Sequence, residues 1–146
     1  MTENPQFDRV KEFNECFGHA VRNTPSIRHD DIRMRFNLVM EEVEEIADAL
    51  YLHEFEGMSE EDALVEVADG IADTLVTLYG FAQATGIPVT EIFDIVADSN
   101  MSKLGEDGKP VYYTDGPKKG KIAKGPNYWD PKDNIREVIR KNMSND

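Results

Sequence analysis

The chain is poor in cysteine and in long apolar runs, and each shortage excludes a class of protein. Its single cysteine, Cys16, rules out a disulfide within the chain. That usage fits a reducing compartment, so we expect a cytoplasmic protein in which Cys16 is a buried or half-buried side chain. No apolar run reaches the roughly 18 residues of a membrane-spanning helix, and we therefore expect no membrane partner.

Positive charge is also scarce. Lysine and arginine number 16 against 29 acidic residues, which gives a net charge of −13. Binding to nucleic-acid backbones requires a positive surface, so we expect no nucleic-acid partner. A phosphate substrate remains compatible with this charge, because bound metal ions reverse the local sign. With 40% hydrophobic residues the composition is globular, and we expect a single domain over residues 1–146.

Helical periodicity extends over most of the chain. Apolar spacing together with start and stop signals predicts helices over residues 5–17, 30–55, 59–85, 90–100 and 131–142. The expected fold is therefore all-α, a helical bundle of about four to five helices with its core in residues 5–101. From residue 102 the periodicity weakens, and glycine, proline and lysine accumulate. Residues 102–146 are expected to form a loop-rich lid or tail, with a small hairpin between residues 111 and 122.

An acidic cluster interrupts the apolar side of the second predicted helix. Residues three and four apart share a helix face, so Glu42 and Glu45 fall within an apolar stripe formed by Leu38, Ala49 and Leu52. Glu41 lies at the border of this stripe. A packed bundle does not hold bare carboxylates there unless a positive group, usually a divalent metal, neutralises them.

The third predicted helix carries a second acidic strip. Glu66, Asp69, Asp73 and Thr77 follow the spacing i, i+3, i+7, i+11 and so share one side. The rest of this helix is apolar nearly all round, and we expect it to be largely buried. An acidic strip is often only a solvated face, and this alternative applies to the third helix more than to the second.

Carboxylates from two neighbouring helices can hold one or more Mg²⁺ or Mn²⁺ ions, because hard cations prefer oxygen ligands. Such ions neutralise phosphate oxygens and orient a water for in-line attack, and a spare carboxylate can take the proton of that water. A loop that bears lysine and asparagine would complete a phosphate site. The residues therefore indicate metal-dependent chemistry on a phosphate compound.

The sequence resembles a known superfamily at these same residues. The pattern Glu41-Glu42-x-x-Glu45 and then Glu66-x-x-Asp69 is similar to the signature of the all-α nucleoside triphosphate pyrophosphatases, which include MazG-like and phosphoribosyl-ATP pyrophosphohydrolase-like proteins. Residues 64–80 and 99–110 are also similar, and the resemblance covers about residues 10–133. It implies a bundle assembled as a homodimer or homotetramer, with Mg²⁺ required and Mn²⁺ often accepted.

The resemblance also implies roles for individual positions. The implied catalytic residues are Glu41, Glu42 and Glu45. The implied metal ligands are Glu42, Glu45, Glu66, Asp69 and Asp73. The second motif aligns in two ways: counted from Glu66 its ligands are Glu66 and Asp69, whereas alignment on the downstream Leu-Tyr-Gly run selects Asp73 and places Gly70 where its partner would be. The implied substrate-binding residues are Asn100, Lys103, Lys124 and Tyr128.

Three functions follow from these observations. The leading prediction is cleavage of a nucleoside triphosphate, ribo or deoxy, between its α- and β-phosphates to the monophosphate and pyrophosphate, in control of the dNTP pool, with dUTP as the first substrate to test. Hydrolysis of phosphoribosyl-ATP comes second, because the segment from Ser99 matches the MazG-like branch better. The third hypothesis is a non-catalytic acidic helical binding module, which divalent metals should not stabilise.

Overall fold

The computed structural model describes residues 3–144, and its regular elements are helices. They are α1 (Pro5–Cys16), α2 (Asp31–Phe55), α3 (Glu60–Thr85), α4 (Val89–Met101) and α5 (Lys132–Met143). The all-α prediction is confirmed, and every predicted helix end lies within one residue of the observed one. Among the described residues, β pairing is limited to an isolated antiparallel bridge between Tyr112 and Ile122. The expected hairpin is present as this bridge, flanked by backbone hydrogen bonds from the Tyr113 N–H to the Lys121 carbonyl and from the Ala123 N–H to the Val111 carbonyl.

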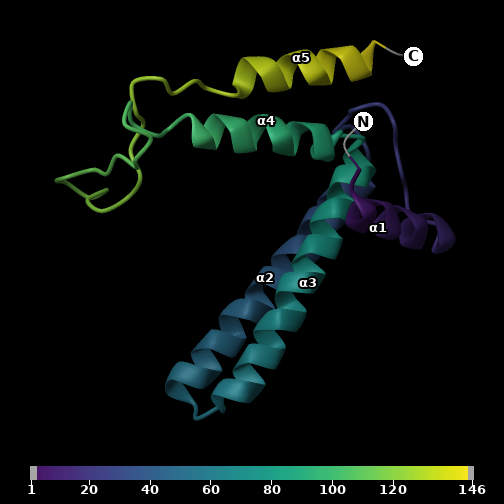
Figure 1. Cartoon of the computed structure of the whole chain (residues 1–146). Helices are drawn as coiled ribbons and strands as arrows, with labels where there is room; N and C mark the ends of the chain where they lie inside the picture. The colour runs from purple at the N-terminus through teal and green to yellow at the C-terminus, as the bar shows by residue number, and fades with distance from the viewer. Residues whose placement is uncertain (1–2, 145–146) are drawn as a thin grey trace. The chain divides into compact units, whose positions relative to one another are not determined.

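Helices α2 and α3 form a long antiparallel hairpin (Figure 1). The connection is short, and α3 begins where the Ser59 side chain accepts a hydrogen bond from the Asp62 backbone N–H at 3.0 Å. That interaction is the helix cap expected from the spacing of these two residues. Small or branched residues lie buried along the hairpin, including Val39 and Ala49 on α2 and Ala63 on α3.

A buried polar network fixes α1 on the hairpin. The Asn14 amide donates to Gln83 Oε1 at 2.9 Å, and the Gln83 amide donates to the Phe7 carbonyl at 3.0 Å. Arg35 donates to Asn14 Oδ1 at 3.0 Å, and His19 Nδ1 lies 2.9 Å from the same oxygen. We call Asn14, His19, Arg35 and Gln83 the Asn14 network. It joins α1 to both helices of the hairpin.

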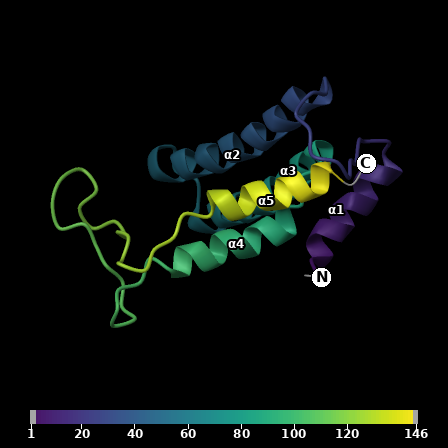
Figure 2. The same ribbon diagram turned by 90° about the horizontal axis from the view of Figure 1, so that it is seen from above.

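The described chain divides into two compact units, residues 3–88 and residues 89–144. In the second unit α4 contacts α5, and the two helices run antiparallel (Figures 1 and 2). Residues 102–131 between them are mostly loop, as predicted. The division falls before α4, whereas the sequence placed the end of the core at residue 101.

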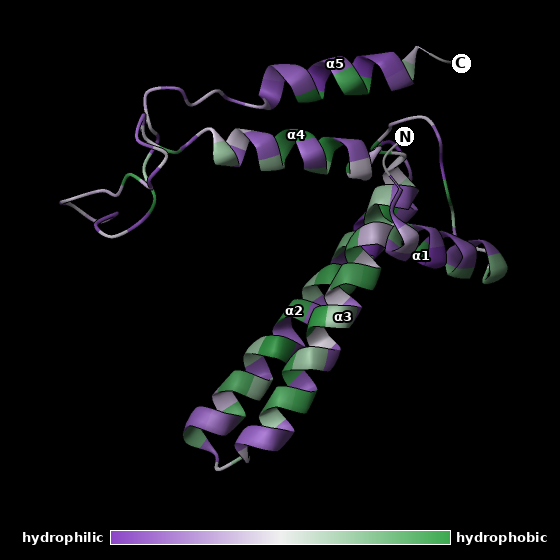
Figure 3. Cartoon of the chain, viewed as in Figure 1, coloured by the Kyte–Doolittle hydropathy of each residue, from purple (hydrophilic) through white to green (hydrophobic). Residues whose placement is uncertain are grey.

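Large apolar side chains remain exposed along α2 and α3 of the single chain, as the hydropathy colouring shows (Figure 3). Leu64 is 63% exposed and Val65 is 61% exposed. The expectation that α3 would be largely buried is therefore wrong for one chain, because its neighbours α1 and α2 cover only part of its circumference. Cys16 is also exposed, contrary to expectation. No helix in residues 3–144 is both long and apolar enough to span a membrane.

Candidate active site

Glu42 is the central residue of the acidic cluster. Glu42 is half-buried on α2, and its carboxylate oxygen Oε2 is buried with no hydrogen-bond partner. Burial raises the pKa of Glu42 above its ordinary value, and the neighbouring charges of Glu45, Asp73 and Asp69 raise this pKa further. An uncompensated buried carboxylate oxygen is costly to the fold. Glu42 therefore lies where a cation would relieve both the desolvation and the mutual repulsion.

The surrounding acids differ in burial. Asp73 on α3 is half-buried, whereas Asp69 and Glu45 are exposed at the rim. Glu66 lies almost one turn before Asp69 on α3, and it is exposed. It is not among the charges that act on Glu42. The charges that raise the pKa of Glu42 are therefore those of Glu45, Asp73 and Asp69, and the role of Glu66 stays a prediction.

Two other predicted positions need separate mention. Glu45 was expected within a buried stripe, but it is exposed, whereas Glu42 is half-buried. Glu41 is exposed as well. Both remain candidate proton acceptors, since a general base has to reach water.

Gly70 allows the close approach of α2 and α3 beside this cluster. A Cβ atom at Gly70 would lie 2.5 Å from Ile46 Cγ1, far inside ordinary contact distance. A larger side chain therefore does not fit at position 70 in this packing. This packing explains why the sequence has glycine at position 70, and a metal-binding carboxylate on α3 then has to come from Glu66, Asp69 or Asp73.

The donor set suits a hard divalent cation. The residues around Glu42 supply carboxylate oxygens only, which is the chemistry that Mg²⁺ and Mn²⁺ prefer. The buried, unpartnered Oε2 of Glu42 is a free ligand atom. Within residues 3–144, no group of three or more acidic, histidine or cysteine side chains is already arranged around one point at ligand distance. The assignment of individual ligands therefore stays a prediction.

The predicted substrate residues lie together in the second unit. Lys103 Nζ donates to Asn100 Oδ1 at 2.9 Å, and the Lys103 carbonyl accepts from the Gly125 N–H at 2.9 Å. Lys124 Nζ lies 4.5 Å from the centre of the Tyr128 ring. A Cβ at Gly125 would collide with the carbonyl of Leu104, so glycine is required for this approach. Lys103 thus contacts Asn100 through its side chain, and its backbone pairs with the residue that follows Lys124.

Hydrogen bonds fix the segment that carries Tyr128 to the end of α4. The Ser99 hydroxyl donates to the Trp129 carbonyl at 2.9 Å, and Ser102 Oγ accepts from the Trp129 N–H at 3.2 Å. Ser99 is buried. The segment that carries Tyr128 is therefore held to the end of α4 by these hydrogen bonds.

Comparison with known proteins assigns the chain to a family. Residues 10–100 match the family described as phosphoribosyl-ATP pyrophosphohydrolase, which is more than half of the chain. The chain belongs to the phosphoribosyl-ATP pyrophosphohydrolase family. This family lies within the MazG-like all-α nucleoside triphosphate pyrophosphatase superfamily, whose members are hydrolases acting on phosphoric anhydrides. The resemblance seen in the sequence is thereby confirmed.

The chain is also similar to a viral protein. An uncharacterized protein of Acanthamoeba polyphaga mimivirus is 31% identical over 86 residues, which are 56% of this chain and 31% of the viral protein. The chain thus spans about a third of the length of the relative it matches.

The sequence interpretation missed one structural feature of this pyrophosphohydrolase family member, the Asn14 network. A signal for it was present: Arg35 lies seven residues before Glu42 and so occupies the same face of α2. The argument that identified Glu42 as a polar residue on an apolar face applies equally to Arg35, which is 6% exposed. Its burial lowers the pKa of the Arg35 guanidinium, and the charge of Asp31 opposes this effect.

Proposed function

We propose that this chain is a divalent-metal-dependent pyrophosphohydrolase that cleaves a nucleoside triphosphate, ribo or deoxy, between its α- and β-phosphates. The products are the nucleoside monophosphate and pyrophosphate. The observation that carries the proposal is the buried, unpartnered oxygen of Glu42 among further carboxylates, in a chain of the pyrophosphohydrolase family. Asp69, Asp73 and Glu45 are the neighbours best placed to share a cation with Glu42.

Each residue of the cluster has a role in this proposal. Glu42, Glu45, Asp69 and Asp73 hold Mg²⁺, or Mn²⁺ in its place, with Glu66 as a weaker candidate. When bound, the ion supplies charge neutralisation at the phosphate oxygens and orients a water for attack. Glu41 or Glu45, whichever is not engaged as a ligand, accepts the proton from that water. Of this acidic set, these two are the exposed members on α2.

The lysine cluster of the second unit has a role of its own. Asn100, Lys103 and Lys124 supply amide and ammonium donors, which suit the oxygens of a triphosphate. Tyr128 holds the Lys124 side chain by a cation–π contact. We propose that these residues bind the phosphate chain of the nucleotide.

The proposed substrate is a deoxynucleoside triphosphate, with dUTP the first to test and the dNTP pool as the setting. A second candidate is phosphoribosyl-ATP, because the matched family carries that name. The segment from Ser99 to Pro110 favours the MazG-like branch, and this segment extends beyond the matched residues 10–100. The lone cysteine fits the reducing cytoplasm as the compartment.

We also propose that the chain works as a homodimer or homotetramer. Apolar side chains on both helices of the hairpin are more than half exposed: Leu50, Tyr51, Phe55, Leu64, Val65 and Ile71. Exposed apolar surface of this kind marks an interaction site in soluble proteins. A second copy of the same hairpin is an apolar partner of matching length.

Pyrophosphate release from a panel of canonical and modified ribo- and deoxynucleoside triphosphates, and from phosphoribosyl-ATP, tests the proposal. The reaction is run with Mg²⁺, with Mn²⁺ and with EDTA. We expect metal-dependent release of monophosphate and pyrophosphate from one or two nucleotides. Glu42→Gln and Asp73→Asn should abolish it while the helical circular dichroism spectrum is unchanged. Turnover of phosphoribosyl-ATP alone would select the second candidate, and a folded protein inactive on the whole panel would contradict the proposal.

A further inference from the structure

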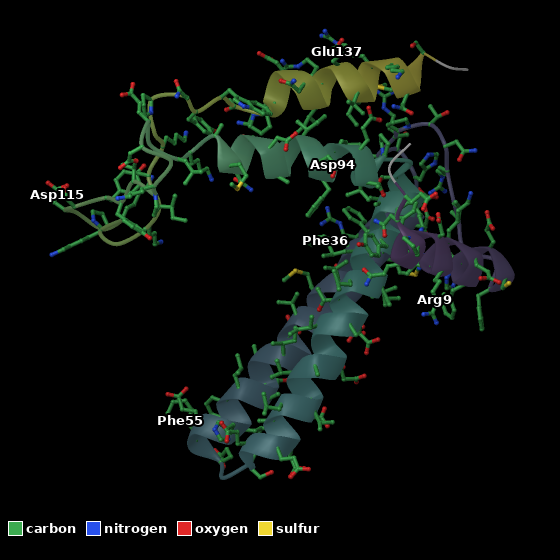
Figure 4. The ribbon with its side chains drawn as sticks, in the orientation of Figure 1. Arg9, Phe36, Phe55, Asp94, Asp115 and Glu137 are labelled. Atoms are coloured by element: carbon green, nitrogen blue, oxygen red, sulfur yellow. The ribbon has the colours of Figure 1, made fainter. Side chains whose placement is uncertain are left out.

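A groove of about 600 Å³ runs between α1 and α3 in the first unit. Its walls are largely apolar, with the aromatic rings of Phe13 on α1 and Tyr79 on α3. Two polar side chains of α1, Gln6 and Arg9, line it as well, and Arg9 projects from that helix in Figure 4. A volume of this size and a mainly apolar lining with a few polar groups are typical of small-molecule sites.

The groove reaches the acidic cluster through one shared residue. Asp73 lines the groove and is also one of the carboxylates whose charge acts on Glu42. A ligand in the groove would therefore have one end beside the proposed metal site. For a nucleotide whose α-phosphate is at that metal, the part left to enter the groove is the nucleoside.

Packing around the groove holds its walls in place. The Tyr79 ring meets the Phe7 ring edge-on at 5.6 Å between centres, and the Phe13 ring stacks on Phe17 at 4.4 Å. Behind them, the buried Asn14 network ties α1 to Gln83 of α3. The two aromatic walls are thus fixed before any ligand arrives, which limits the entropy lost on binding.

Arg9 supplies donors that no residue of the described chain uses. Within residues 3–144 its guanidinium has neither an ion pair nor a hydrogen bond. Arginine donates and never accepts, so it favours carbonyl oxygens, whereas the Gln6 amide both donates and accepts. Uracil, thymine and guanine present carbonyl oxygens, and adenine has none.

We infer that the groove between α1 and α3 binds the nucleoside of the substrate and selects a base that carries carbonyl oxygens. The base lies against the aromatic side chains, and Arg9 and Gln6 contact its polar edge. This inference rests on the proposed function, since it takes the α-phosphate to be at the acidic cluster. It disfavours phosphoribosyl-ATP, whose base is an adenine.

Two variants test the groove, each with a matched control outside it. Arg9→Met removes the donors, and Ala72→Trp fills the groove from α3, where Ala72 is exposed. The controls are Arg33→Met and Ala47→Trp, both at exposed positions of α2 that do not line the groove. Hydrolysis of dUTP and dATP is measured for each protein, and binding of dUMP and dAMP is measured separately by calorimetry.

We expect Arg9→Met to lose about 10- to 100-fold in kcat/KM for dUTP, the range for a lost charged hydrogen bond. Ala72→Trp should lose about as much (~10-fold or more), because its indole occupies the space of the nucleoside. Arg9→Met should also reduce the preference for dUTP over dATP, while the controls stay within about threefold of the wild type. Groove variants that bind dUMP and hydrolyse dUTP like the wild type would overturn the inference. A wild type that binds neither dUMP nor dAMP would also overturn the inference. The same holds if Ala72→Trp changes the oligomeric mass but neither dUMP binding nor dUTP hydrolysis.

Failure of the proposed function has a different signature. A wild type that binds dUMP in the groove, with the binding lost in Arg9→Met and Ala72→Trp, but releases no pyrophosphate would uphold the groove and contradict the hydrolysis. The calorimetric measurement needs no turnover and so separates the two outcomes.

Discussion

At the scale of single residues, the ionised Glu42 carboxylate that the proposed metal site requires destabilises the metal-free protein. Because the folded protein raises the pKa of Glu42 above its ordinary value of 4.5, the folded state holds this proton more tightly than the unfolded state. Below 4.5 both states are protonated and nothing is lost. As the pH rises from 4.5 through the folded pKa, the metal-free protein loses stability.

Glu42→Gln should remove that loss. In EDTA, the melting temperature of the wild type should fall more between pH 5 and pH 7.5 than that of the variant, so the variant is the more stable at neutral pH. Added Mg²⁺ should raise the melting temperature of the wild type, because it binds the folded state, and should have little effect on the variant. Parallel pH profiles and an equal response to Mg²⁺ would contradict the role of Glu42.

Asn14 is the second residue with a separate prediction. Asn14→Ala removes the donor to Gln83 Oε1 and the acceptor of one Arg35 guanidinium nitrogen, and unsatisfied buried polar groups are costly. We expect a loss of about 2 kcal/mol or more in the free energy of unfolding, measured with urea. Asn37→Ala, at an exposed position of α2, should change it by less than about 0.5 kcal/mol. Equal effects would mean that the network does not stabilise α1.

At the scale of helices, the spacing of α2 and α3 depends on Gly70. Gly70→Ala improves intrinsic helix propensity by about 1 kcal/mol, but the new methyl group overlaps Ile46. Overpacking typically costs about 1–3 kcal/mol, so we expect a net loss of stability. In an Ile46→Ala background the same substitution should stabilise, because the space is then open. Urea unfolding of the wild type, the two single variants and the double variant measures this change of sign. If Gly70→Ala had the same effect in both backgrounds, the close packing would be refuted.

The helices themselves were the part of the fold most readily predicted. All five were expected from apolar periodicity, and Ser59 marked the start of α3 through its cap. Local signals suffice for these features because helix propensity and capping act over a few residues. The pairing between residues 111 and 122 was weaker in the sequence, and in the structure it is one bridge with a few flanking backbone hydrogen bonds.

At the scale of the whole molecule, the exposed hairpin predicts self-association. We expect light scattering to give the mass of a dimer or tetramer at micromolar concentration. The double variant Val65→Asp/Leu78→Asp places charges on exposed apolar positions of α3 and should lower that mass. Glu61→Asp, a conservative change on the same helix, is the control. A wild type with the mass of one chain would contradict the expectation.

The sequence by itself determined the five helices and the family, and it marked Glu42 as an acid on an apolar face. The helices and the place of Glu42 depend on residue order along one helix, where a period of 3.6 residues fixes which side chains share a face. The family is recognised from motifs spread over several helices. Tertiary structure alone decided that an oxygen of Glu42 is buried without a hydrogen-bond partner, that Gly70 excludes a side chain beside Ile46, and that Arg35 meets Asn14. Those outcomes depend on the register between packed helices, which is set by side-chain contacts between distant residues and is not encoded in the period of either helix.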